Sequence, residues 1–234
     1  GMAWEADKEA EDMGIAFFDV DGDKDLDIYV VSGGGGEFKA GDVTLQDRLY
    51  INDGKGGFQK SKDALPEMLV SGQAIATEDF DGDGDLDIFV GGRGVPGKYP
   101  FSERSFLLQN DGGKFSDVTE KNAPELVNIG MVNDVLWSDF DGDGVNDLIV
   151  VGEWMSLQFF RNEKGRFTNA SAEMGLQNTE GWWFSVAEGD FNKDGRMDYV
   201  VGNLGLNSKF KASEYKPFEV FADDFDGTGT IDIV

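Results

Sequence analysis

The amino-acid sequence predicts an all-β fold, namely a partial β-propeller with about four blades, each a four-stranded antiparallel sheet. Three observations predict it. An acidic motif followed by an apolar strand recurs along the chain, 33 of the 234 residues are glycine, and no long segment has strong helical periodicity. Glycine at about twice its usual share, without the strict period of collagen, is typical of a chain with many tight turns.

The recurring motif begins at an aspartate and occurs five times. The copies read DVDGDKDLDIYVV from Asp19, DFDGDGDLDIFVGG from Asp79, DFDGDGVNDLIVVG from Asp139, DFNKDGRMDYVVG from Asp190 and DFDGTGTIDIV from Asp224. Successive copies start 60, 60, 51 and 34 residues apart. A period of roughly 50–60 residues is too long for most helical repeats and suits a four-stranded propeller blade with its loops.

A second motif follows each of the first three acidic segments. It consists of an apolar strand, a turn that Asn opens, and another strand. The copies read RLYINDGKGGFQ at 48–59, FLLQNDGGKFSDVT at 106–119 and FFRNEKGRFTNAS at 159–171. Asn and Gly tolerate the positive φ of hairpin turns, so we expect the third and fourth strands of each blade here.

The first strand of each blade should precede the acidic segment and the second should follow it. First strands are expected at 14–18, 74–77, 132–137 and 183–187, and second strands at 27–31, 87–90, 147–151 and 198–201. The resulting blades are 14–63, 72–120, 131–172 and 183–234, the last incomplete, in one repeat domain of 14–234. Residues 1–13 are expected to be a leader or truncation region with a helix over 4–13, and 61–68 and 119–126 to hold single helical turns.

A β-sandwich with acidic hairpins is the alternative fold. Its strands also recur at intervals of about 8–12 residues. A sandwich, however, does not require the same unit at a regular spacing, which a propeller does.

The composition restricts the chemistry that the chain can support. It has 46 acidic and 20 basic residues, a net charge of −26, and neither Cys nor His. Disulfides, thiolate zinc sites and cysteine nucleophiles are excluded, and any metal must be held by oxygen. Nucleic acid is not an expected partner because its binding needs a basic surface. No apolar run approaches the ~20 residues of a membrane span.

The second acidic copy shows why the motif suits a metal ion. Asp79, Asp81, Asp83 and Asp87 occupy positions 1, 3, 5 and 9, and the glycines between them let the backbone curl until the carboxylates converge. Asp85, at position 7, can offer its backbone carbonyl. About six or seven oxygens around one centre suit calcium, whereas magnesium prefers a rigid octahedron and retains its waters.

We predict calcium as the cofactor and ligands for it in all five loops. The predicted ligands are Asp19, Asp21, Asp23, Asp25 and Asp27; Asp79, Asp81, Asp83, Asp85 and Asp87; Asp139, Asp141, Asp143, Val145 and Asp147; Asp190, Asn192, Asp194, Arg196 and Asp198; and Asp224, Asp226 and Asp232. We expect weaker binding in the fourth loop, where Asn192 replaces a carboxylate. Thr228 stands at position 5 of the fifth loop, so that site is expected to be weak or empty.

Two other interpretations of the acidic loops fit the sequence less well. An EF-hand needs a bidentate Glu at position 12 between two helices, but position 12 is Val30, Val90, Val150 or Val201 on a predicted strand. Acidic turns that bind nothing are the second alternative, strongest for the fifth loop. Against it, carboxylates about 4 Å apart repel by roughly 4 kcal/mol per pair at an effective dielectric constant of about 20, and a dication removes that repulsion.

At these residues the sequence resembles the FG-GAP/VCBS repeat family, the unit of integrin-α-type propellers, from about residue 14 to residue 234. The shared pattern is Asp-x-Asp/Asn-x-Asp-x-x-x-Asp before an apolar strand. The resemblance implies a seven-bladed propeller in the intact protein, with calcium in loops on one rim. GNLGLNSKFKAS followed by DFDGTGTIDIV is similar to the ASPIC/UnbV-associated, cartilage acidic protein-like subgroup, which implies a secreted, periplasmic or cell-surface location.

The leading functional hypothesis is a calcium-stabilised scaffold that binds an unknown protein or carbohydrate ligand. The segment 91–105 is the best candidate for recognition because it gathers Arg93, Lys98, Tyr99 and Arg104 in an acidic chain. The alternative interpretation of this segment is an ordered loop between strands. Trp154, Trp182 and Trp183 could form a platform for a sugar, or they could be core residues, since large aromatic side chains dominate cores.

Two further hypotheses belong to other classes. A carbohydrate-active enzyme could use paired carboxylates as acid and base, but the best-placed carboxylates are assigned to metal and no other base stands out. No catalytic residue is predicted, and we do not expect an enzyme. The third hypothesis is a structural spacer within a large surface protein. Unpaired strands at the open edges could also lead the chain to dimerise.

Overall fold

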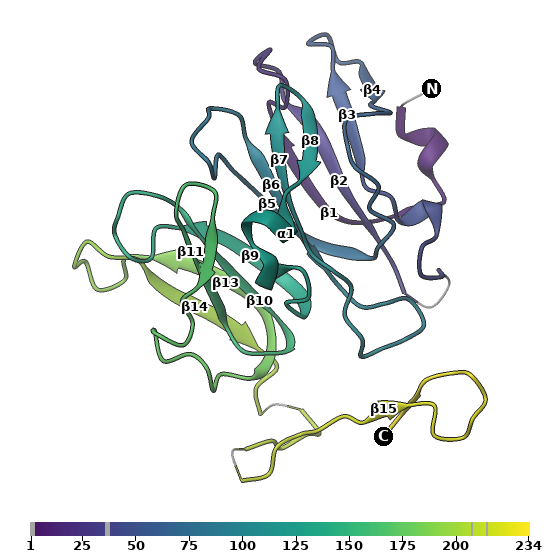
Figure 1. Ribbon diagram of the computed structural model, residues 1–234, viewed down its shortest axis with the longest axis vertical. Helices are drawn as coiled ribbons and strands as arrows, with labels where there is room; N and C mark the ends of the chain where they lie inside the picture. Colours follow the sequence, from purple (N-terminus) through teal and green to yellow (C-terminus); the bar gives the residue numbers. More distant parts are fainter. Residues whose placement is uncertain (1–2, 36–37, 207, 214) are drawn as a thin grey trace.

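The structure is a computed structural model that describes residues 3–35, 38–206, 208–213 and 215–234. Three antiparallel blades of four strands follow one another along the chain (Figure 1); the first two are separate sheets, and the third is part of a six-stranded sheet. Blade 1 consists of β1 (Glu11–Phe18), β2 (Asp27–Gly33), β3 (Arg48–Asn52) and β4 (Phe58–Lys60). Blade 2 consists of β5 (Gly72–Glu78), β6 (Asp87–Gly92), β7 (Phe106–Asp111) and β8 (Lys114–Asp117). Blade 3 consists of β9 (Met131–Ser138), β10 (Asp147–Met155), β11 (Gln158–Asn162) and β12 (Phe167–Asn169).

The strands of each blade pair in the order in which they follow along the chain. The acidic segment connects the first strand to the second, and the Asn-led turn connects the third to the fourth, as predicted. The first strands of neighbouring sheets also contact one another: β1 contacts β5, and β5 contacts β9. Inner strands that meet side by side are the arrangement of propeller blades around an axis. The predicted fold class is therefore confirmed.

Apolar clusters fill the space between successive sheets. Tyr29 and Leu49 of blade 1 pack with Ile88 and Leu108 of blade 2 in one cluster, and all four side chains are almost fully buried. A second cluster joins blades 2 and 3, and a third joins blade 3 to the strands that follow it. A sheet therefore has both of its faces buried only where another sheet packs on each side of it.

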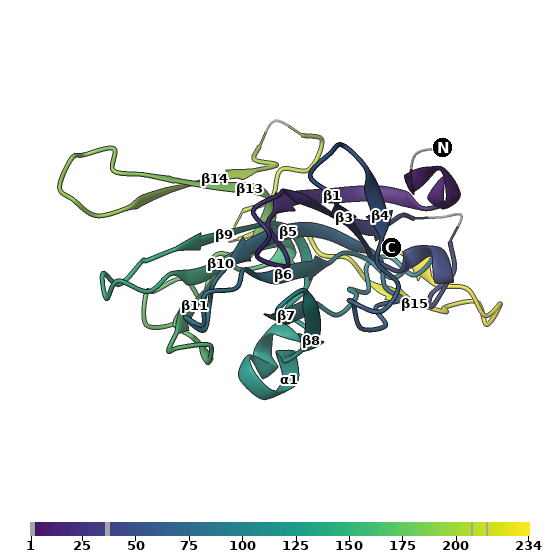
Figure 2. The same cartoon turned by 90° about the horizontal axis from the view of Figure 1, so that it is seen from above.

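The chain after blade 3 forms two strand pairs. The fourth unit consists of β13 (Gly181–Gly189) and β14 (Asp198–Asn203), and β13 also joins β10 of blade 3. The fifth unit is a separate pair of β15 (Ala222–Asp223) and β16 (Asp232–Ile233), which lies away from the other sheets in Figure 1 and therefore behind them when seen from above in Figure 2. The segment 183–234, predicted as one incomplete blade, therefore contains two strand pairs, each around its own acidic loop.

The helix expected over residues 4–13 is not formed, and this prediction was wrong. A 3-10 helix, η1 (Ala3–Asp7), precedes β1, which already begins at Glu11. The reason is packing: the Trp4 ring lies 6.3 Å from the Tyr50 ring, edge to face, and 6.1 Å from the Phe58 ring. The segment expected to be a leader thus packs against blade 1.

The remaining helical turns are short. Residues 119–126 contain α1 (Thr119–Asn122) and the 3-10 helix η3 (Pro124–Leu126), as predicted, whereas 61–68 contains no helical turn. A 3-10 helix that the sequence did not predict, η2 (Val43–Leu45), is capped by the Asp42 carboxylate, which accepts the Thr44 N–H at 3.0 Å. Among the described residues, no helix combines the length and apolarity that crossing a membrane requires.

Candidate metal centres

Each acidic loop folds around its own first carboxylate. In the second loop, the Asp79 carboxylate accepts the backbone N–H groups of Gly82 at 2.9 Å and of Gly84 at 3.1 Å. Gly82 and Gly84 have φ values of +78° and +103°, which explains glycine at both positions. The first carboxylate of each other loop likewise accepts two backbone N–H groups of its own loop; these carboxylates are Asp19, Asp139, Asp190 and Asp224.

The last aspartate of the loop ties together three parts of its blade. Asp87 accepts the N–H of Phe80, in the same loop, at 3.1 Å and the N–H of Asn110, at the end of the third strand, at 2.8 Å. Asp27 and Asp147 make the equivalent pairs of hydrogen bonds in blades 1 and 3. Because β2, β6 and β10 begin at these aspartates, the loop carboxylates are held at the start of a buried strand.

The structure brings together positions 1, 3 and 9 of four loops. In each of these loops, one oxygen from each of three carboxylates lies within 4.8 Å of the other two. The clusters are Asp19, Asp21 and Asp27; Asp79, Asp81 and Asp87; Asp139, Asp141 and Asp147; and Asp224, Asp226 and Asp232. Three converging carboxylates are a donor set that suits a hard divalent cation such as calcium.

The position-5 carboxylates lie outside these clusters. Each accepts the backbone N–H of position 7 instead, at 2.8–3.0 Å. These pairs are Asp23 with Asp25, Asp83 with Asp85, Asp143 with Val145 and Asp194 with Arg196. The sequence groups positions 1, 3, 5 and 9 as one ligand set, whereas the structure gathers three of the four and uses the fourth to close the turn.

The fourth loop is arranged as its sequence leads one to expect, whereas the fifth differs from expectation. The fourth loop has the same turn, but Asn192 leaves only two carboxylates, Asp190 and Asp198, at the three gathered positions. The fifth loop, expected to be weak or empty because of Thr228, gathers Asp224, Asp226 and Asp232 as the first three loops do. Thr228 occupies position 5, which lies outside the clusters in the other loops, so this substitution does not disturb the gathering.

Burial raises the pKa of the last aspartate in all three complete blades. Desolvation raises the pKa of Asp87 to about 7 and that of Asp147 to about 6, although the backbone hydrogen bonds to each carboxylate act in the opposite direction. The neighbouring carboxylates of the same loops raise both pKa values further. The pKa of Asp27 is also raised, again mainly by desolvation. Burial therefore favours the protonated form of these carboxyl groups, relative to an exposed aspartate, unless a positive charge compensates for it.

Sequence reasoning missed a contact that joins the acidic loops of blades 1 and 2 to the blade that follows each of them. The Asn110 side-chain amide donates to the carbonyl of Val20, in the loop of blade 1, at 2.9 Å. Likewise, the Asn162 amide donates to the carbonyl of Phe80, in the loop of blade 2, at 2.8 Å. Asn52 of blade 1 bonds only within its own sheet, to Leu26 O at 3.1 Å. The sequence does contain an indication of this contact, because Asn opens the turn at this position in three repeats.

The same turns pack against the position-3 aspartates of the preceding blade. A Cβ atom on Gly113 would lie 3.3 Å from the Cβ of Asp21, and one on Gly165 would lie 3.0 Å from the Cβ of Asp81. Both glycines also have positive φ. Each acidic loop of the complete blades 1 and 2 is thus covered by backbone of the blade that follows.

Two position-3 aspartates have a polar partner from the third strand of their own blade. The Arg161 Nε donates to Asp141 Oδ2 at 2.7 Å, and the same guanidinium lies 3.4 Å from the Glu173 carboxylate. The Gln109 amide donates to Asp81. The third loop therefore carries a compensating positive charge that the first two lack in this position.

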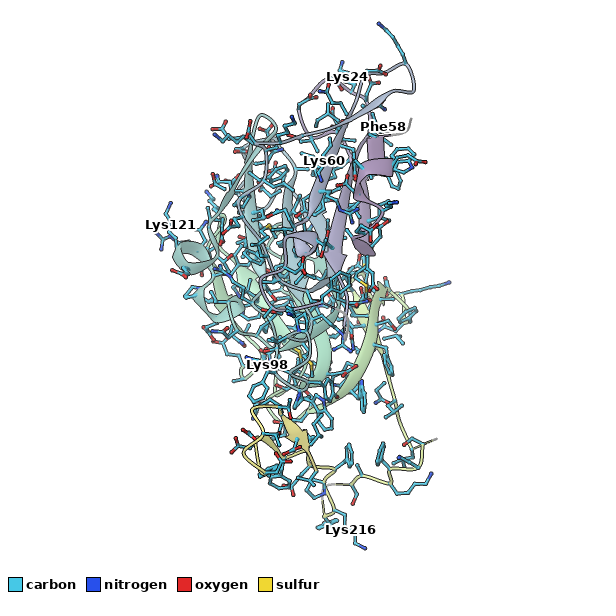
Figure 3. The ribbon with its side chains drawn as sticks, turned by 90° about the vertical axis from the view of Figure 1, so that its right-hand side faces the viewer. Lys24, Phe58, Lys60, Lys98, Lys121 and Lys216 are labelled. Carbon is cyan, nitrogen blue, oxygen red and sulfur yellow. The ribbon has the colours of Figure 1, made fainter. Side chains whose placement is uncertain are left out.

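The segment 91–105 lies at the end of blade 2 opposite its acidic loop, because that loop precedes β6 and the segment follows it. Figure 3 shows Lys24 of the first acidic loop near the top and Lys98 of this segment far below it. Its guanidinium groups are already paired, Arg93 with the buried Glu153 of β10 and Arg104 with Asp117 at 2.8 Å. The segment is an ordered loop, and the two arginines that were candidates for recognition form ion pairs within the protein.

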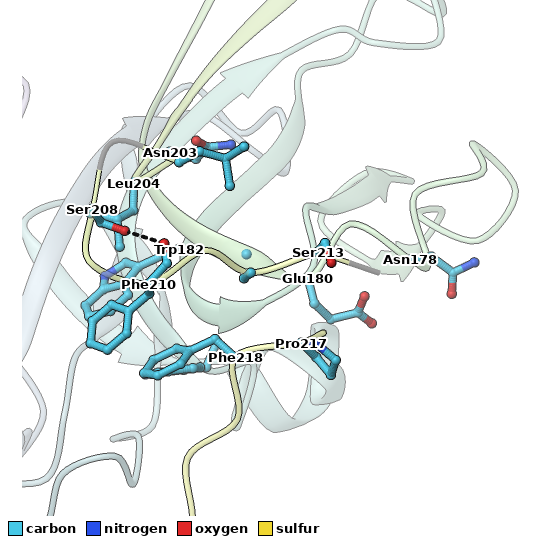
Figure 4. A pocket seen from close by; sticks show the side chains of 15 residues that line it. Asn178, Glu180, Trp182, Asn203, Leu204, Ser208, Phe210, Ser213, Pro217 and Phe218 are labelled. Carbon is cyan, nitrogen blue, oxygen red and sulfur yellow. Dashed lines mark hydrogen bonds between the residues drawn. The ribbon is translucent and has the colours of Figure 1, made fainter. Parts of the chain in front are cut away.

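The tryptophans divide between core and surface. Trp183 packs with the third apolar cluster, and its indole N–H donates to the Thr179 carbonyl at 3.0 Å. Trp154 and Trp182 line a cavity at the same end of the molecule as the segment 91–105 (Figure 4). The core interpretation therefore describes Trp183, whereas the other two tryptophans remain candidates for ligand contact.

Comparisons with known proteins add a family to this geometry. The model of the FG-GAP-like repeat matches residues 19–90 and 139–201. Cartilage acidic protein 1 of Mus musculus and that of Homo sapiens are each 23% identical over 217 residues, which cover 84% of this chain and 32% and 31% of those proteins. The chain therefore spans about a third of the length of these relatives.

Among solved structures, rhamnogalacturonan lyase PL11 of Bacillus licheniformis superposes on this chain with a TM-score of 0.49 and 13% identity. The superposition covers 96% of this chain and 46% of the lyase. At that level of similarity, nothing about activity follows for this chain.

Proposed function

Because the chain belongs to the FG-GAP-like repeat family, we propose that it is a calcium-stabilised binding scaffold that acts outside the cell or on its surface. The single observation that supports calcium binding most strongly is that the carboxylate cluster is repeated. Clusters of three carboxylates stand at the same place in three successive blades, each at the start of a buried strand. Isolated acidic groups on a surface are common, but a chance arrangement does not recur in register.

In this proposal, positions 1, 3 and 9 of the first three loops hold the ion, and position 5 and the position-7 carbonyl complete its oxygen shell. The donor set fits because it contains only oxygen and carries enough charge for a dication. The raised pKa values of Asp87 and Asp147 identify the unfavourable burial that calcium would offset. The role of the metal is structural, since the ligands lie on both sides of the connection between the first two strands.

The extracellular part of the proposal is supported by the relatives named cartilage acidic protein 1 and by the need of such sites for calcium at millimolar concentration. An enzymatic role is not proposed. The gathered carboxylates are assigned to metal, and the chain has no His or Cys to serve as a general base or nucleophile. A structural spacer within a larger surface protein remains the alternative within the same class of non-enzymatic proteins.

Calorimetric titration with calcium tests the proposal. The chain should bind at least three calcium ions, and Asp81→Asn, which removes a ligand of the second cluster, should reduce that number by one. Glu120→Gln changes the same charge on an exposed residue of α1 and should leave the number unchanged. The proposal is wrong if the unaltered chain binds no calcium at millimolar concentration, or if both variants reduce binding equally.

A further inference from the structure

We infer that a cavity formed by blade 3, the fourth unit and the described residues 204–206, 208–213 and 217–218 binds a neutral oligosaccharide. The inference rests on the proposed function only in treating the chain as a binding scaffold, and it supplies a ligand class that the acidic loops do not. The cavity has a volume of about 620 Å³ and lies between the end of β10, the start of β13 and the end of β14. This volume is in the range of small-molecule sites.

The cavity lies at the end of the strands remote from the acidic loops. Trp154 is seven residues beyond Asp147 on β10, a distance of about 23 Å along an extended strand. Trp182 lies at the start of β13, whereas the fourth acidic loop follows the end of that strand. Ligand contact here would therefore not compete with a metal ion for the same side chains.

One wall of the cavity is a row of four aromatic rings. The centroid of Trp154 lies 5.4 Å from that of Trp182 and 5.5 Å from that of Phe218, and the centroids of Phe218 and Phe210 are 4.1 Å apart. Figure 4 shows Trp182, Phe210 and Phe218 together on one side of the cavity. Rings in contact with one another form a continuous apolar surface, which suits the C–H face of a sugar ring.

The opposite side of the cavity is polar. Asn178 and Glu180 lie there in Figure 4, and Asn203 contributes a further amide at the end of β14. Within the part of the chain that the structure describes, these three exposed side chains are engaged in no hydrogen bond. The indole N–H of Trp182 is fully buried and likewise has no acceptor among the described residues. Unused donors and acceptors beside an apolar wall match a ligand with hydroxyl groups around an apolar ring.

Trp154 is held in an unusual backbone conformation. Its φ is +59°, a left-handed value that costs a non-glycine residue on the order of 1 kcal/mol or more and is found preferentially at functional sites. The indole N–H donates to Tyr99 Oη at 2.7 Å, and Tyr99 in turn contacts the Glu153 carboxylate at 3.4 Å. The segment 91–105 thus fixes the orientation of a ring in the cavity wall instead of meeting the ligand through its own charges.

The geometry and the charge select among ligands that aromatic rings can bind. A cage for a quaternary ammonium group turns ring faces toward one point from different directions. Here, successive rings are inclined by only 35°, 29° and 31°, so they form a row and not a cage. Anionic sugars are disfavoured by Glu180 in the lining and by the net charge of −26. A neutral saccharide is the class that remains.

The experiment is a titration of the calcium-loaded full chain with neutral oligosaccharides built on glucose, mannose, xylose or galactose, followed by tryptophan fluorescence and calorimetry. We expect saturable binding to at least one of them. Trp182→Phe keeps a ring but removes the unpaired N–H, so it should weaken that binding roughly fivefold. Trp154→Ala should abolish it, and a thermal unfolding curve of each variant checks that the fold persists.

Tyr215→Ala removes a ring that is 93% exposed and lies outside the cavity lining, and it should leave binding unchanged. Phe101→Ala tests the segment 91–105 itself. The inference is overturned if no neutral saccharide binds, if only choline or polygalacturonate binds, or if Phe101→Ala abolishes binding while Trp182→Phe has no effect. If calcium stabilises the chain but no saccharide binds, the inference alone fails; if saccharide binds but calcium does not stabilise, the proposed function alone fails.

Discussion

The acidic loops of blades 1 to 3 and those of the fourth and fifth units share the same turn in different surroundings. In the complete blades, a third strand supplies an Asn whose N–H binds the last aspartate of the loop, and that aspartate is at most 1% exposed. The fourth and fifth units lack this strand among the described residues, and Asp198 and Asp232 are only half-buried. The aromatic or aliphatic residue at position 2 follows the same trend: Phe80 is 1% exposed, whereas Phe191 is 63% exposed.

This difference separates what a loop does alone from what its neighbours add. The turn, with its carboxylate surrounded by N–H groups, forms in all five copies and is therefore a local property of the sequence. Burial, the raised pKa values and the Asn bond to the preceding loop occur only where further strands cover the loop. We conclude that the acidic motif shapes the site and that the further strands packed around it, above all the third strand of its own blade, determine how strongly its carboxylates are desolvated.

The largest effect should come from removing calcium. Ligand at about 100 times its dissociation constant stabilises a protein by about 2.7 kcal/mol per site, so three sites together contribute about 8 kcal/mol. At roughly 2–4 °C per kcal/mol for a chain of this size, excess chelator should lower the Tm by tens of degrees. Differential scanning calorimetry with and without chelator measures the shift.

The comparison predicts where that stabilisation originates. Asp190→Asn and Asp224→Asn, in the exposed loops, should leave most of the chelator effect intact, whereas Asp79→Asn should remove a large part of it. An equal loss for all three variants would show that burial by neighbouring strands does not matter.

The next largest effect should come from the Asn contacts between blades. Asn110→Ala leaves the buried carbonyls of Val20 and Leu86 without their donor, which should destabilise the chain by about 3 kcal/mol. Asn52→Ala removes a bond to one carbonyl within its own sheet and should cost about 1 kcal/mol. Chemical denaturation of both variants measures the difference, and similar losses would argue against a role for the contact between blades.

A smaller effect should appear in the pH dependence of the metal-free protein. A carboxyl group whose pKa is raised by folding contributes stability below its unfolded pKa, and this contribution is lost as the pH rises through the folded value. For Asp147 and Asp87 the folded values are about 6 and about 7, so metal-free protein should lose stability between about pH 4 and pH 7. With calcium the dependence should reverse, because calcium binds the deprotonated groups. Urea unfolding at both pH values, with and without calcium, measures this.

A buried carboxyl outside the loops provides the control. Asp47 accepts hydrogen bonds from Tyr29 Oη at 2.8 Å and from Ser32 N–H at 2.7 Å, and burial raises its pKa to about 7. Asp47→Asn should remove its share of the loss between about pH 4 and pH 7, in the presence and in the absence of calcium alike. A variant whose pH dependence vanishes only without calcium would contradict the assignment of the reversal to the loops.

The smallest effect concerns the fifth loop. Thr228→Asp restores the position-5 carboxylate in a loop that already gathers three others, so calcium affinity there should rise by a few-fold. The change should be visible as one additional ion in a calcium titration, with little shift in Tm because the fifth unit is separate from the blades. A large rise in Tm would indicate that this loop is more strongly coupled to the blades than the structure suggests.

The sequence predicted the strands, the acidic loops and the Asn turns because each is a short pattern that recurs. It could not predict contacts between residues that are distant in the chain. Asn110 and Val20 are 90 residues apart, and neither the Asn turn nor the acidic motif contains information about which residue it contacts in another blade. The packing of Trp4 on blade 1 overrode a weak helical tendency for the same reason. The left-handed Trp154 has no local signal, since it depends on Tyr99, 55 residues away.

Crystals grown with ample calcium provide the most direct measurement, through anomalous scattering at the first three acidic loops. The account predicts an ion within each of the clusters of Asp19, Asp79 and Asp139, with oxygen ligands at about 2.3–2.6 Å. Water alone in all three clusters at saturating calcium would contradict it.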